Sequence, residues 1–411
     1  MTSTPSRLRT QRRLPRWKEL APLLRVRRWE VDGRKRRLQR ALTVADLADI
    51  ARRRTPRSVF DYVDGAAEAG LGLERAHQAF ARVELDARIL RDVTSVDTST
   101  TILGRRADIP LILAPTGFTR MMHHEGEPAV ARAAAAAGIP YTLSTMGTTS
   151  PADLMAAAPT GQNWFQLYLW RDRAATLELI ESARAAGYDT LVLTVDTPVA
   201  GNRLRDARNG LTIPPTLNLR TLLDMSRHPS WWANLLTTAP LEFAALRSFD
   251  GTVAELVDIM FDPALTFEDL AWLRTQWGGN LVVKGLQSVE DVRLVIDAGV
   301  DGIVVSNHGG RQLDRAATPL ELLPAVVAAV DGRCQVFLDT GVLSGADIVA
   351  ALGMGADACM VGRAYLYGLM AGGERGVERA LDLFRSEMTR TMQLMGVASV
   401  GDLRGRARLR P

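Results

Sequence analysis

Cysteine is nearly absent from this chain, since Cys334 and Cys359 are the only two in 411 residues. Two cysteines cannot build the disulfide framework of a small secreted scaffold, and they suit a reducing cytoplasm. They also lack the spacing of a metal-ligand pair. We therefore expect two buried, chemically inert thiols and no bound metal.

Long apolar runs and a dinucleotide-binding fingerprint are missing as well. The longest uncharged stretch, Ala133 to Ala152, is interrupted by Gly, Pro and several Ser and Thr, so it does not predict a membrane span. No apolar segment follows Arg12-Arg13 as it would in a secretion signal. No Gly-x-Gly-x-x-Gly stands between a predicted strand and helix, so a Rossmann NAD site is not expected.

Acidic side chains are scarce in residues 1–40, which hold fourteen Lys/Arg and three Asp/Glu. This basic N-terminal arm has a net charge of +11, whereas the whole chain has only +4. Such an arm can meet an anionic membrane surface or nucleic acid, and the alternative is an arm that is solvated or docked on a partner. Because no nucleic-acid-binding motif accompanies it, we expect no nucleic-acid partner.

The remainder of the chain has the composition and rhythm of an α/β protein. Apolar residues make up 47% and charged residues 23%, which is typical of a soluble, folded protein. Short apolar segments alternate with alanine- and leucine-rich helical stretches, and this alternation predicts a (β/α)8 TIM barrel. The eight predicted strands are Ile109–Ala114, Tyr141–Ser144, Trp164–Leu169, Thr190–Val195, Asn280–Lys284, Gly302–Ser306, Gln335–Leu338 and Ala358–Val361.

The predicted barrel domain covers residues 41–395 and is followed by a C-terminal tail, residues 396–411. It begins with N-terminal helices, the first of which has an N-cap at Thr43. A long insert, about residues 206–265, follows the fourth strand and contains the apolar pair Trp231-Trp232. The insert is predicted to be a lid, an oligomer contact or a membrane-surface patch, unless it packs on its own barrel.

The stretch Gly302–Asp314 combines a buried strand with a group of polar residues. Its apolar start predicts a strand covered on both faces. His308 follows the strand, Gly309-Gly310 allows a sharp turn, and Arg311 brings a planar charge to the same place. Each residue alone is more often structural. Together they supply a base and a carboxylate clamp, which are the parts needed to oxidise a small hydroxy acid.

Polar residues also follow most of the other predicted strands. In a (β/α)8 barrel the C-terminal ends of the strands meet at one face, where catalytic residues lie. We therefore expect these side chains to surround one site. They are Pro115-Thr116-Gly117, Ser144, Gln166, Tyr168, Thr194, Asp196, Lys284, His308, Asp339 and Gly362-Arg363.

The motif Ser306-Asn307-His308-Gly309-Gly310-Arg311-Gln312-Leu313-Asp314 resembles the active-site signature of the FMN-dependent α-hydroxy-acid oxidase and dehydrogenase family. The resemblance extends over about residues 40–395 and is most similar to actinobacterial quinone-dependent L-lactate dehydrogenases. Two further segments carry this similarity, Thr116-Gly117-Phe118-Thr119-Arg120 and Gly362-Arg363-Ala364-Tyr365-Leu366-Tyr367-Gly368.

The resemblance implies a role for each candidate residue. His308 is the catalytic base because its pKa lies near neutral pH, and Asp196 is its partner. Arg203, seven residues after Asp196, and Arg311 clamp the substrate carboxylate, although Arg205 is an alternative to Arg203. Tyr62 and Tyr168 join them at the substrate, and Lys284 places a positive charge beside the flavin. FMN is held by Pro115, Thr116, Gly117, Ser144, Gln166, Thr194, Lys284, Ser306, Asp339, Thr340, Gly341, Gly362 and Arg363.

Three positions depart from the usual family pattern. Leu343 replaces the arginine that commonly faces the FMN phosphate. Gly117 replaces the alanine of the oxidases, and a glycine there is typical of relatives that pass electrons to a quinone or a protein. Met146 replaces a tryptophan of the glycolate-oxidising relatives, which argues against glycolate as the substrate.

We therefore expect an enzyme that oxidises an L-2-hydroxy acid, most simply L-lactate to pyruvate, and passes the electrons to a quinone or another non-oxygen acceptor. Alternatives within the fold are an oxidase that uses O2 and a dehydrogenase of a larger, mandelate-like or peptide-derived acid. A barrel that has lost catalysis and serves as a binding module is a remote alternative. The expected location is cytoplasmic, with peripheral contact to the inner membrane face through the arm and Trp231-Trp232. The resemblance also implies a homo-oligomer, commonly a tetramer.

Overall fold

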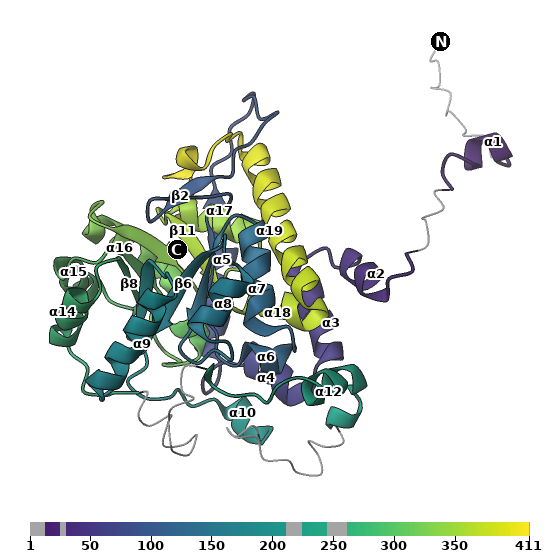
Figure 1. The fold of residues 1–411 in the computed structure, drawn as a ribbon. Helices are drawn as coiled ribbons and strands as arrows, with labels where there is room; N and C mark the ends of the chain where they lie inside the picture. Colours follow the sequence, from purple (N-terminus) through teal and green to yellow (C-terminus); the bar gives the residue numbers. More distant parts are fainter. Residues whose placement is uncertain (1–12, 25–29, 211–223, 245–260, 411) are drawn as a thin grey trace.

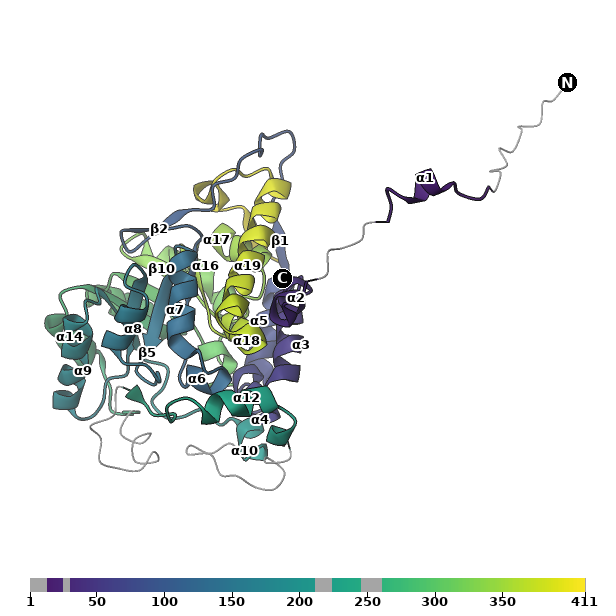
Figure 2. The same ribbon diagram turned by 45° about the vertical axis from the view of Figure 1, so that its right-hand side comes forward.

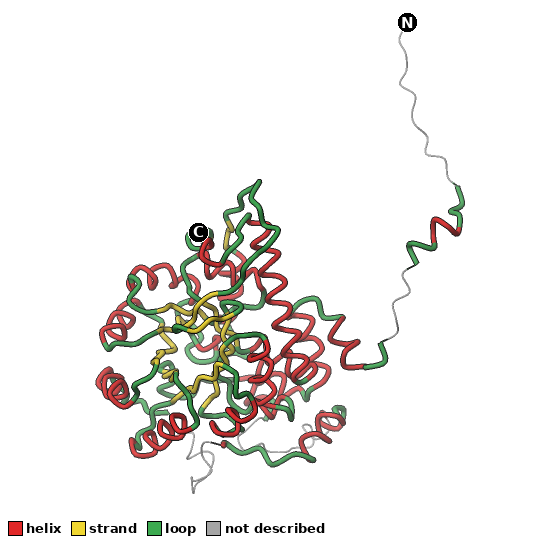
Figure 3. Tube along the Cα trace, turned by 45° about the horizontal axis from the view of Figure 1, so that its top comes forward, coloured by secondary structure: helices red, strands yellow, loops and turns green. Residues whose placement is uncertain are grey.

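The computed structural model describes residues 13–24, 30–210, 224–244 and 261–410. Eight parallel strands close into a barrel, and the chain order of the strands is also their order around it. Figure 3 shows this ring of strands enclosed by helices. The predicted (β/α)8 fold is confirmed. The barrel strands are β4 (Leu111–Leu113), β5 (Pro140–Ser144), β6 (Gln162–Leu167), β7 (Thr190–Thr194), β8 (Asn280–Leu286), β9 (Gly302–Val305), β10 (Gln335–Leu338) and β11 (Ala358–Val361).

The strands are short and almost entirely buried. Every residue of β5, β7, β9 and β11 is buried, as expected for parallel strands with side chains inside and helices outside. Strand β4 is shorter than the predicted Ile109–Ala114. Strand β8 runs past the predicted end at Lys284 to Leu286, through an irregularity in its pairing with β9.

The interior of the barrel is filled by apolar side chains, including Ile112, Val192 and Val282. The rings of Trp164 and Phe337 meet there with their centroids 6.2 Å apart. A second and larger cluster lies between the strands and the outer helices. Because the middle of the barrel is packed, a ligand cavity can form only at its ends.

Helices cover the outside of the barrel, as Figure 1 shows. Each barrel strand is followed by one or more helices that return the chain to the start of the next strand. The helices are α6 (Thr119–Met122), α7 (Gly126–Ala136), α8 (Pro151–Ala157), α9 (Arg173–Ala185), α10 (Leu204–Arg208), α12 (Pro229–Leu236), α14 (Phe267–Gln276), α15 (Val289–Asp297), α16 (Pro319–Val330), α17 (Gly345–Gly353), α18 (Arg363–Gly372) and α19 (Glu374–Met395), with a 3-10 turn η2 (His308–Gly310) before α16.

Of the helices before the barrel, three (α2, α3 and α4) pack against its last helices, α18 and α19, and α5 packs against α16. The predicted N-cap is present at Thr43, whose hydroxyl accepts a hydrogen bond from Asp46 N at 3.1 Å. Pro56 precedes the next helix, which carries Tyr62 to the barrel mouth. Helix α1 has no buried residue and is drawn away from the barrel in Figure 2. These helices are α1 (Trp17–Leu20), α2 (Gly33–Gln39), α3 (Val44–Arg54), α4 (Arg57–Asp64) and α5 (Leu71–Ala81).

Within the insert that follows β7, α12 packs against the barrel domain, with a hydrogen bond to α6. Trp231 is 9% exposed, and its indole N–H donates to Met121 O at 2.9 Å. Trp232 is half-buried and meets Trp231 edge-on. Trp231 therefore lies against its own barrel, which is the alternative that the sequence left open. Leu236, at the end of α12, is 73% exposed.

Short strands outside the barrel tie the tail to the start of the domain. Strand β12 (Ala407–Leu409) pairs antiparallel with β1 (Val83–Leu85), after the 3-10 turn η3 (Val400–Leu403). A second ribbon joins β2 (Thr100–Ile102) to β3 (Arg105–Ala107). Both cysteines are unpaired, with Cys359 buried and Cys334 half-buried. Among the helices of the described ranges, none combines the length and the hydropathy needed to cross a bilayer.

Candidate active site

A cavity of about 280 Å³ opens at the C-terminal ends of the barrel strands. Most of the residues predicted for the site line it. The exceptions are Gln166, Thr194, Asp196 and Ser306, which lie directly behind the lining residues and support or adjoin them. The lining residues from the prediction are Tyr62, Pro115, Thr116, Gly117, Ser144, Tyr168, Arg203, Lys284, His308, Arg311, Asp339, Thr340, Gly341, Gly362 and Arg363.

His308 is held at the end of β9 by its own turn and by a carboxylate from β7. Its backbone has φ +58, a left-handed conformation that is unusual for a residue other than glycine. Its N–H donates to Ser306 Oγ at 3.0 Å, and its ring Nδ1 lies 2.8 Å from Asp196 Oδ1. This contact leaves Nε2 as the ring atom able to exchange a proton with a ligand in the cavity.

Burial and neighbouring charges set the protonation of this pair. Burial lowers the pKa of His308, although the Asp196 carboxylate opposes that shift, so the imidazole is neutral at pH 7. Burial by itself would raise the pKa of Asp196, but His308, which is protonated in the acidic range where a carboxyl group titrates, and the charge of Lys284 outweigh it, and the pKa is lowered. The pair is thus a neutral base beside a fixed negative charge.

Lys284 is a buried charge at the end of β8 with fixed partners. Its Nζ lies 3.1 Å from Asp339 Oδ2 and 3.0 Å from Ser306 Oγ. Burial would lower the pKa of this lysine, but the carboxylates of Asp339 and Asp196 raise it above its ordinary value. Lys284 therefore keeps a positive charge inside the cavity wall.

Two arginines and two tyrosines surround the outer part of the cavity. Arg311 donates to Tyr62 O at 2.5 Å, and its guanidinium lies 5.0 Å from the centroid of the Tyr62 ring. Burial, together with Arg203, lowers the pKa of Arg311 to about 9. Within the described chain, Arg203 Nε is buried and has no hydrogen-bond partner. Two like charges that converge in this way favour an anion between them. Arg205, the alternative, instead pairs with Asp64 at 2.9 Å.

Directly behind the lining of the cavity lie buried polar atoms that have no hydrogen-bond partner among the described residues. Ser144 Oγ donates to Gln166 Oε1 at 3.0 Å, yet Gln166 Nε2 has no partner among the described residues. Thr194 Oγ1 is in the same situation. Gly117 also lines the cavity and lies so close to Met146 that a Cβ at position 117 would be 2.9 Å from Met146 Cβ, so a larger residue there would force a shift. Buried polar atoms are normally satisfied, so this wall suits a flat polar ligand.

The loops after β10 and β11 form the remaining edge of the cavity. Thr340 has φ +72, and its hydroxyl accepts from Gly309 N at 3.0 Å while it donates to Asp339 Oδ1 at 2.8 Å. Arg363 is half-buried in the same region and donates to Val63 O at 3.0 Å and to Gly65 O at 2.6 Å. Leu343 packs against the hydrophobic core and does not line the cavity.

Several supporting residues were not predicted from the sequence. Gln312 Nε2 donates to Asp196 O at 3.1 Å and thereby holds the loop of the histidine's partner. Asp314 accepts from Ala69 N at 3.1 Å and ties the helices before the barrel to the site. Both lie in the quoted motif, which was the available signal. Phe261 lines the cavity and meets Tyr168 edge-on at 5.7 Å, and no sequence pattern pointed to it.

A base, a buried cation and two converging arginines in the mouth of a (β/α)8 barrel define an enzyme that acts on a small carboxylate. The chain belongs to the FMN-dependent dehydrogenase family, whose model matches residues 51–410. A Mycobacterium tuberculosis protein named "Putative L-lactate dehydrogenase" is 56% identical over 392 residues, which are 95% of each chain. The L-lactate dehydrogenase of Caulobacter vibrioides is 43% identical over 368 residues, covering 88% of this chain and 96% of the relative.

Solved structures agree with this family. The monotopic membrane protein (S)-mandelate dehydrogenase has a TM-score of 0.87 and 36% identity, and the match covers 90% of this chain and all of that one (100%). A mandelate oxidase has a TM-score of 0.78 and 39% identity over 90% of this chain and 99% of its own. The resemblance stated from the sequence is thus confirmed at the level of the family.

The chain is FMN-dependent, as its family is, and the residues of the cavity fit that cofactor. The unpartnered atoms of Gln166 and Thr194 match the hydrogen-bonding edge of a flavin ring. The buried charge of Lys284 suits a ring that gains electrons.

Proposed function

We propose that this protein oxidises L-lactate to pyruvate and passes the electrons to a quinone or another non-oxygen acceptor. The observation that carries the proposal is the His308–Asp196 pair facing a cavity on which Arg203 and Arg311 converge. The names of the two relatives above support lactate as the substrate.

In the proposed mechanism the two arginines bind the substrate carboxylate. Arg311 and Arg203 offer planar pairs of N–H donors, which suit a carboxylate better than a lysine would. The hydroxyl groups of Tyr62 and Tyr168, which also line the cavity, complete the binding of the carboxylate. This binding holds the substrate hydroxyl beside His308, since proton transfer needs hydrogen-bond reach.

His308 then removes the hydroxyl proton at Nε2, while Asp196 stabilises the imidazolium through the Nδ1 contact. A bound FMN would supply the acceptor for the α-hydrogen and its two electrons. Lys284 holds positive charge beside the ring, and Pro115, Thr116, Ser144, Ser306 and the loops at Asp339–Gly341 and Gly362-Arg363 hold the cofactor in this proposal. In place of an arginine at position 343, Arg363 and backbone N–H groups would hold the phosphate.

The proposal includes contact with a membrane surface, where a quinone would be found. Exposed apolar side chains support it, with Trp17 70%, Leu23 76% and Leu236 73% exposed. The neighbouring structure of (S)-mandelate dehydrogenase is that of a monotopic membrane protein, which supports the same contact. Because Trp231 is buried, the contact is assigned to the basic arm and the end of α12.

A homotetramer is part of the same proposal and would be tested by light scattering.

A larger substrate of the mandelate type is the second candidate. The wall around the substrate region contains Met146 and Phe261, whose apolar side chains could receive an aromatic ring. The solved neighbours are also named for mandelate. Under this reading, (S)-mandelate should reduce the enzyme faster than L-lactate at equal concentration.

An anaerobic spectrum of the purified enzyme, recorded before and after L-lactate is added, tests the proposal. We expect the oxidised flavin bands to disappear with L-lactate and to persist with D-lactate. Reoxidation should be fast with a soluble quinone and slow with air, whereas fast reoxidation in air would identify an oxidase. The His308→Ala variant should stay yellow and unreduced, and reduction at the wild-type rate would refute the assigned base.

A further inference from the structure

A second cavity lies on the flank of the barrel, outside the active site. We call it the arginine pocket because four arginines line it. Its volume is about 50 Å³, and its walls come from α2, α3, α6, α12 and α18. Met122 lines both this pocket and the active-site cavity, so the two are neighbours across α6. The ionisable groups of the pocket are Arg34, Arg37, Arg54, Arg120, His123 and His124.

Positive charge is concentrated in the arginine pocket. All four arginines are half-buried, whereas Arg40 and Arg53 on the same helices or next to them are exposed. In the part of the chain that the structure describes, Glu125 is the one carboxylate that forms an ion pair with any of the four. With both imidazoles neutral, the group therefore has a formal net charge of about +3.

The charges in the pocket act on one another. Burial lowers the pKa of Arg37, and Arg54 and Arg34 lower it further. Burial likewise lowers the pKa of His123 to about 4, with Arg34 and Arg54 among the contributing charges. Like charges that are held together and partly removed from water repel, and an anion between them would relieve that repulsion.

Many of the hydrogen-bond donors in the pocket have no protein acceptor. A guanidinium has five N–H groups. Within the described ranges, Arg54 donates once, to Ser230 Oγ at 3.1 Å. The Nδ1 atom of His124 is buried and has no partner among the described residues. Donors of this kind, converging from α3 and from the end of α6, are the means by which proteins hold a phosphate.

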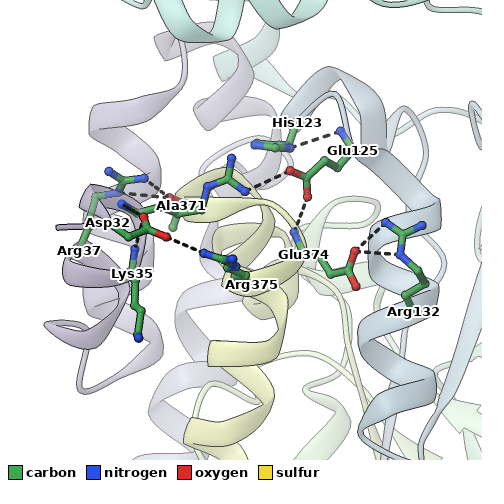
Figure 4. Close-up of polar contacts among 10 residues, drawn as sticks. Asp32, Lys35, Arg37, His123, Glu125, Arg132, Ala371, Glu374 and Arg375 are labelled. Carbon is green, nitrogen blue, oxygen red and sulfur yellow. Dashed lines mark hydrogen bonds and ion pairs between the residues drawn. The ribbon is translucent and has the colours of Figure 1, made fainter. Parts of the chain in front are cut away.

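A metal ion is the competing occupant, because ring nitrogens of His123 and His124 and a carboxylate oxygen of Glu125 lie within 4.8 Å of one another. Figure 4 shows why this reading is weaker: Glu125 is already engaged. Its carboxylate accepts from Glu374 N at 2.7 Å and from Arg34 at 3.2 Å. His123 Nδ1 accepts from Glu125 N at 3.3 Å. The surrounding arginines repel a cation.

We propose that the arginine pocket is a binding site for a phosphate group, supplied by a free ion or by a phospholipid headgroup. The size agrees, since a water needs roughly 10–15 Å³ on this measure and the pocket is several times larger. Helices α2 and α3 contribute arginine donors to the site, and α12 of the insert forms part of its wall. A phosphate bound there would therefore contact both the N-terminal helices and the insert. It lies outside the catalytic residues described above.

Calorimetric titration of the FMN-loaded enzyme with inorganic phosphate tests the proposal. We expect saturable binding that weakens by at least about tenfold in Arg54→Gln, because a charge-assisted bond is lost. Arg53→Gln is the matched control, since it removes the same charge from an exposed position on α3. Flavin absorbance and lactate turnover with a soluble dye should be unchanged in both variants. Arg120→Gln, on α6, repeats the test should Arg54→Gln fail to fold.

Vesicles distinguish the two sources of the phosphate group. Binding to phosphatidylglycerol vesicles, absent with phosphatidylcholine and lost in Arg54→Gln but not in Arg53→Gln, would assign a lipid headgroup. Phosphate binding with the same dependence, and no vesicle binding, would assign a free anion. If Arg54→Gln and Arg120→Gln bind phosphate and vesicles as the wild type does, the proposal is wrong. A site at the substrate arginines would give that result.

Discussion

The protonation of His308 depends on two opposing influences from its surroundings. Burial disfavours the imidazolium, and the Asp196 carboxylate favours it. The first is stronger, so the folded-state pKa of His308 lies below its ordinary value. A base must be deprotonated to act, and activity should therefore rise with pH through this lowered pKa and be complete at neutral pH.

Asp196→Asn should move that acidic limb to lower pH. The carboxylate raises the pKa of His308, so its removal lowers that pKa further. We also expect kcat to fall by about 10²-fold or more. In the variant His308 is a weaker base, and no negative charge stabilises its protonated form. The pH profile of kcat/KM, measured with a soluble dye, checks both effects. A limb that stays in place or moves upward would show that another group titrates.

Arg311→Lys should raise KM for lactate strongly, by about tenfold or more, with a smaller change in kcat. A lysine keeps the charge but cannot supply two parallel N–H donors to a carboxylate. Arg205→Lys is the control, because Arg205 pairs with Asp64 at 2.9 Å and is absent from the cavity lining. Equal KM values for Arg311→Lys and the wild type would place the carboxylate clamp elsewhere.

The residues of the site were largely predictable, since each follows a strand and all strand ends meet at one face. The choice between Arg203 and Arg205 was not, because both lie in one short loop and only the folded chain shows that Arg203 lines the cavity. Phe261 was missed for a similar reason. It precedes α14 with no periodic pattern, and its contact with Tyr168 depends on the path of the insert.

At the scale of single elements, N-terminal capping stabilises α3, a helix that packs beside the site. Thr43 and Asp46 form a reciprocal capping box at the start of α3, with Thr43 N donating to Asp46 Oδ2 at 3.0 Å. The helix packs along α18, which begins at the cavity with Arg363. Stability of α3 thus supports one wall of the site.

Thr43→Ala should lower the free energy of unfolding by about 1 kcal/mol, because the N-cap hydroxyl is lost. Thr43→Ser is the control, since serine caps as well as threonine does. Urea unfolding followed by tryptophan fluorescence measures the difference. Equal midpoints for the alanine and serine variants would mean that the cap contributes nothing. Turnover of the folded enzyme should be the same in all three proteins.

Element bounds were predicted less accurately than element types. Alternation of apolar strands and helices identified all eight barrel strands, because buried parallel strands are distinctive in composition. The ends depend on local backbone detail. Strand β8, for example, continues beyond Lys284 through Gly285. Gly285 has a φ of +112, a conformation that glycine adopts readily and other residues rarely do. The hydrophobic periodicity of the sequence does not predict this irregularity in the strand.

At the scale of the whole molecule, part of the basic arm is joined to the barrel. Arg34 pairs with Glu125 at 3.2 Å. Arg375 pairs with Asp32 at 2.6 Å, as Figure 4 shows. Leu38 is 5% exposed, close to Gly372. The charge of the arm could not predict that α2 is docked on the barrel domain, because the sequence does not distinguish an arginine in an ion pair from a solvated one.

Removal of residues 1–29 should leave the melting temperature and the dye-linked turnover unchanged, because it spares α2. Removal of residues 1–40 deletes α2 together with its ion pairs and the burial of Leu38, and we expect Tm to fall by about 2 °C or more. Thermal unfolding of both truncated proteins at equal FMN content measures the effect. The same Tm in both would show that α2 adds no stability.

The seam of the barrel has a consequence for how the chain is made. Strand β4, the first around the ring, is hydrogen-bonded to β11, the last, and Leu113 is aligned with Val361 about 250 residues later. A ribosome must therefore release almost the entire polypeptide before the ring can shut. During that interval β4 and the strand most recently added to the sheet each have an unpaired edge, which is open to association with other chains. Yield during rapid synthesis should accordingly depend more on chaperone supply than on the strength of any single contact.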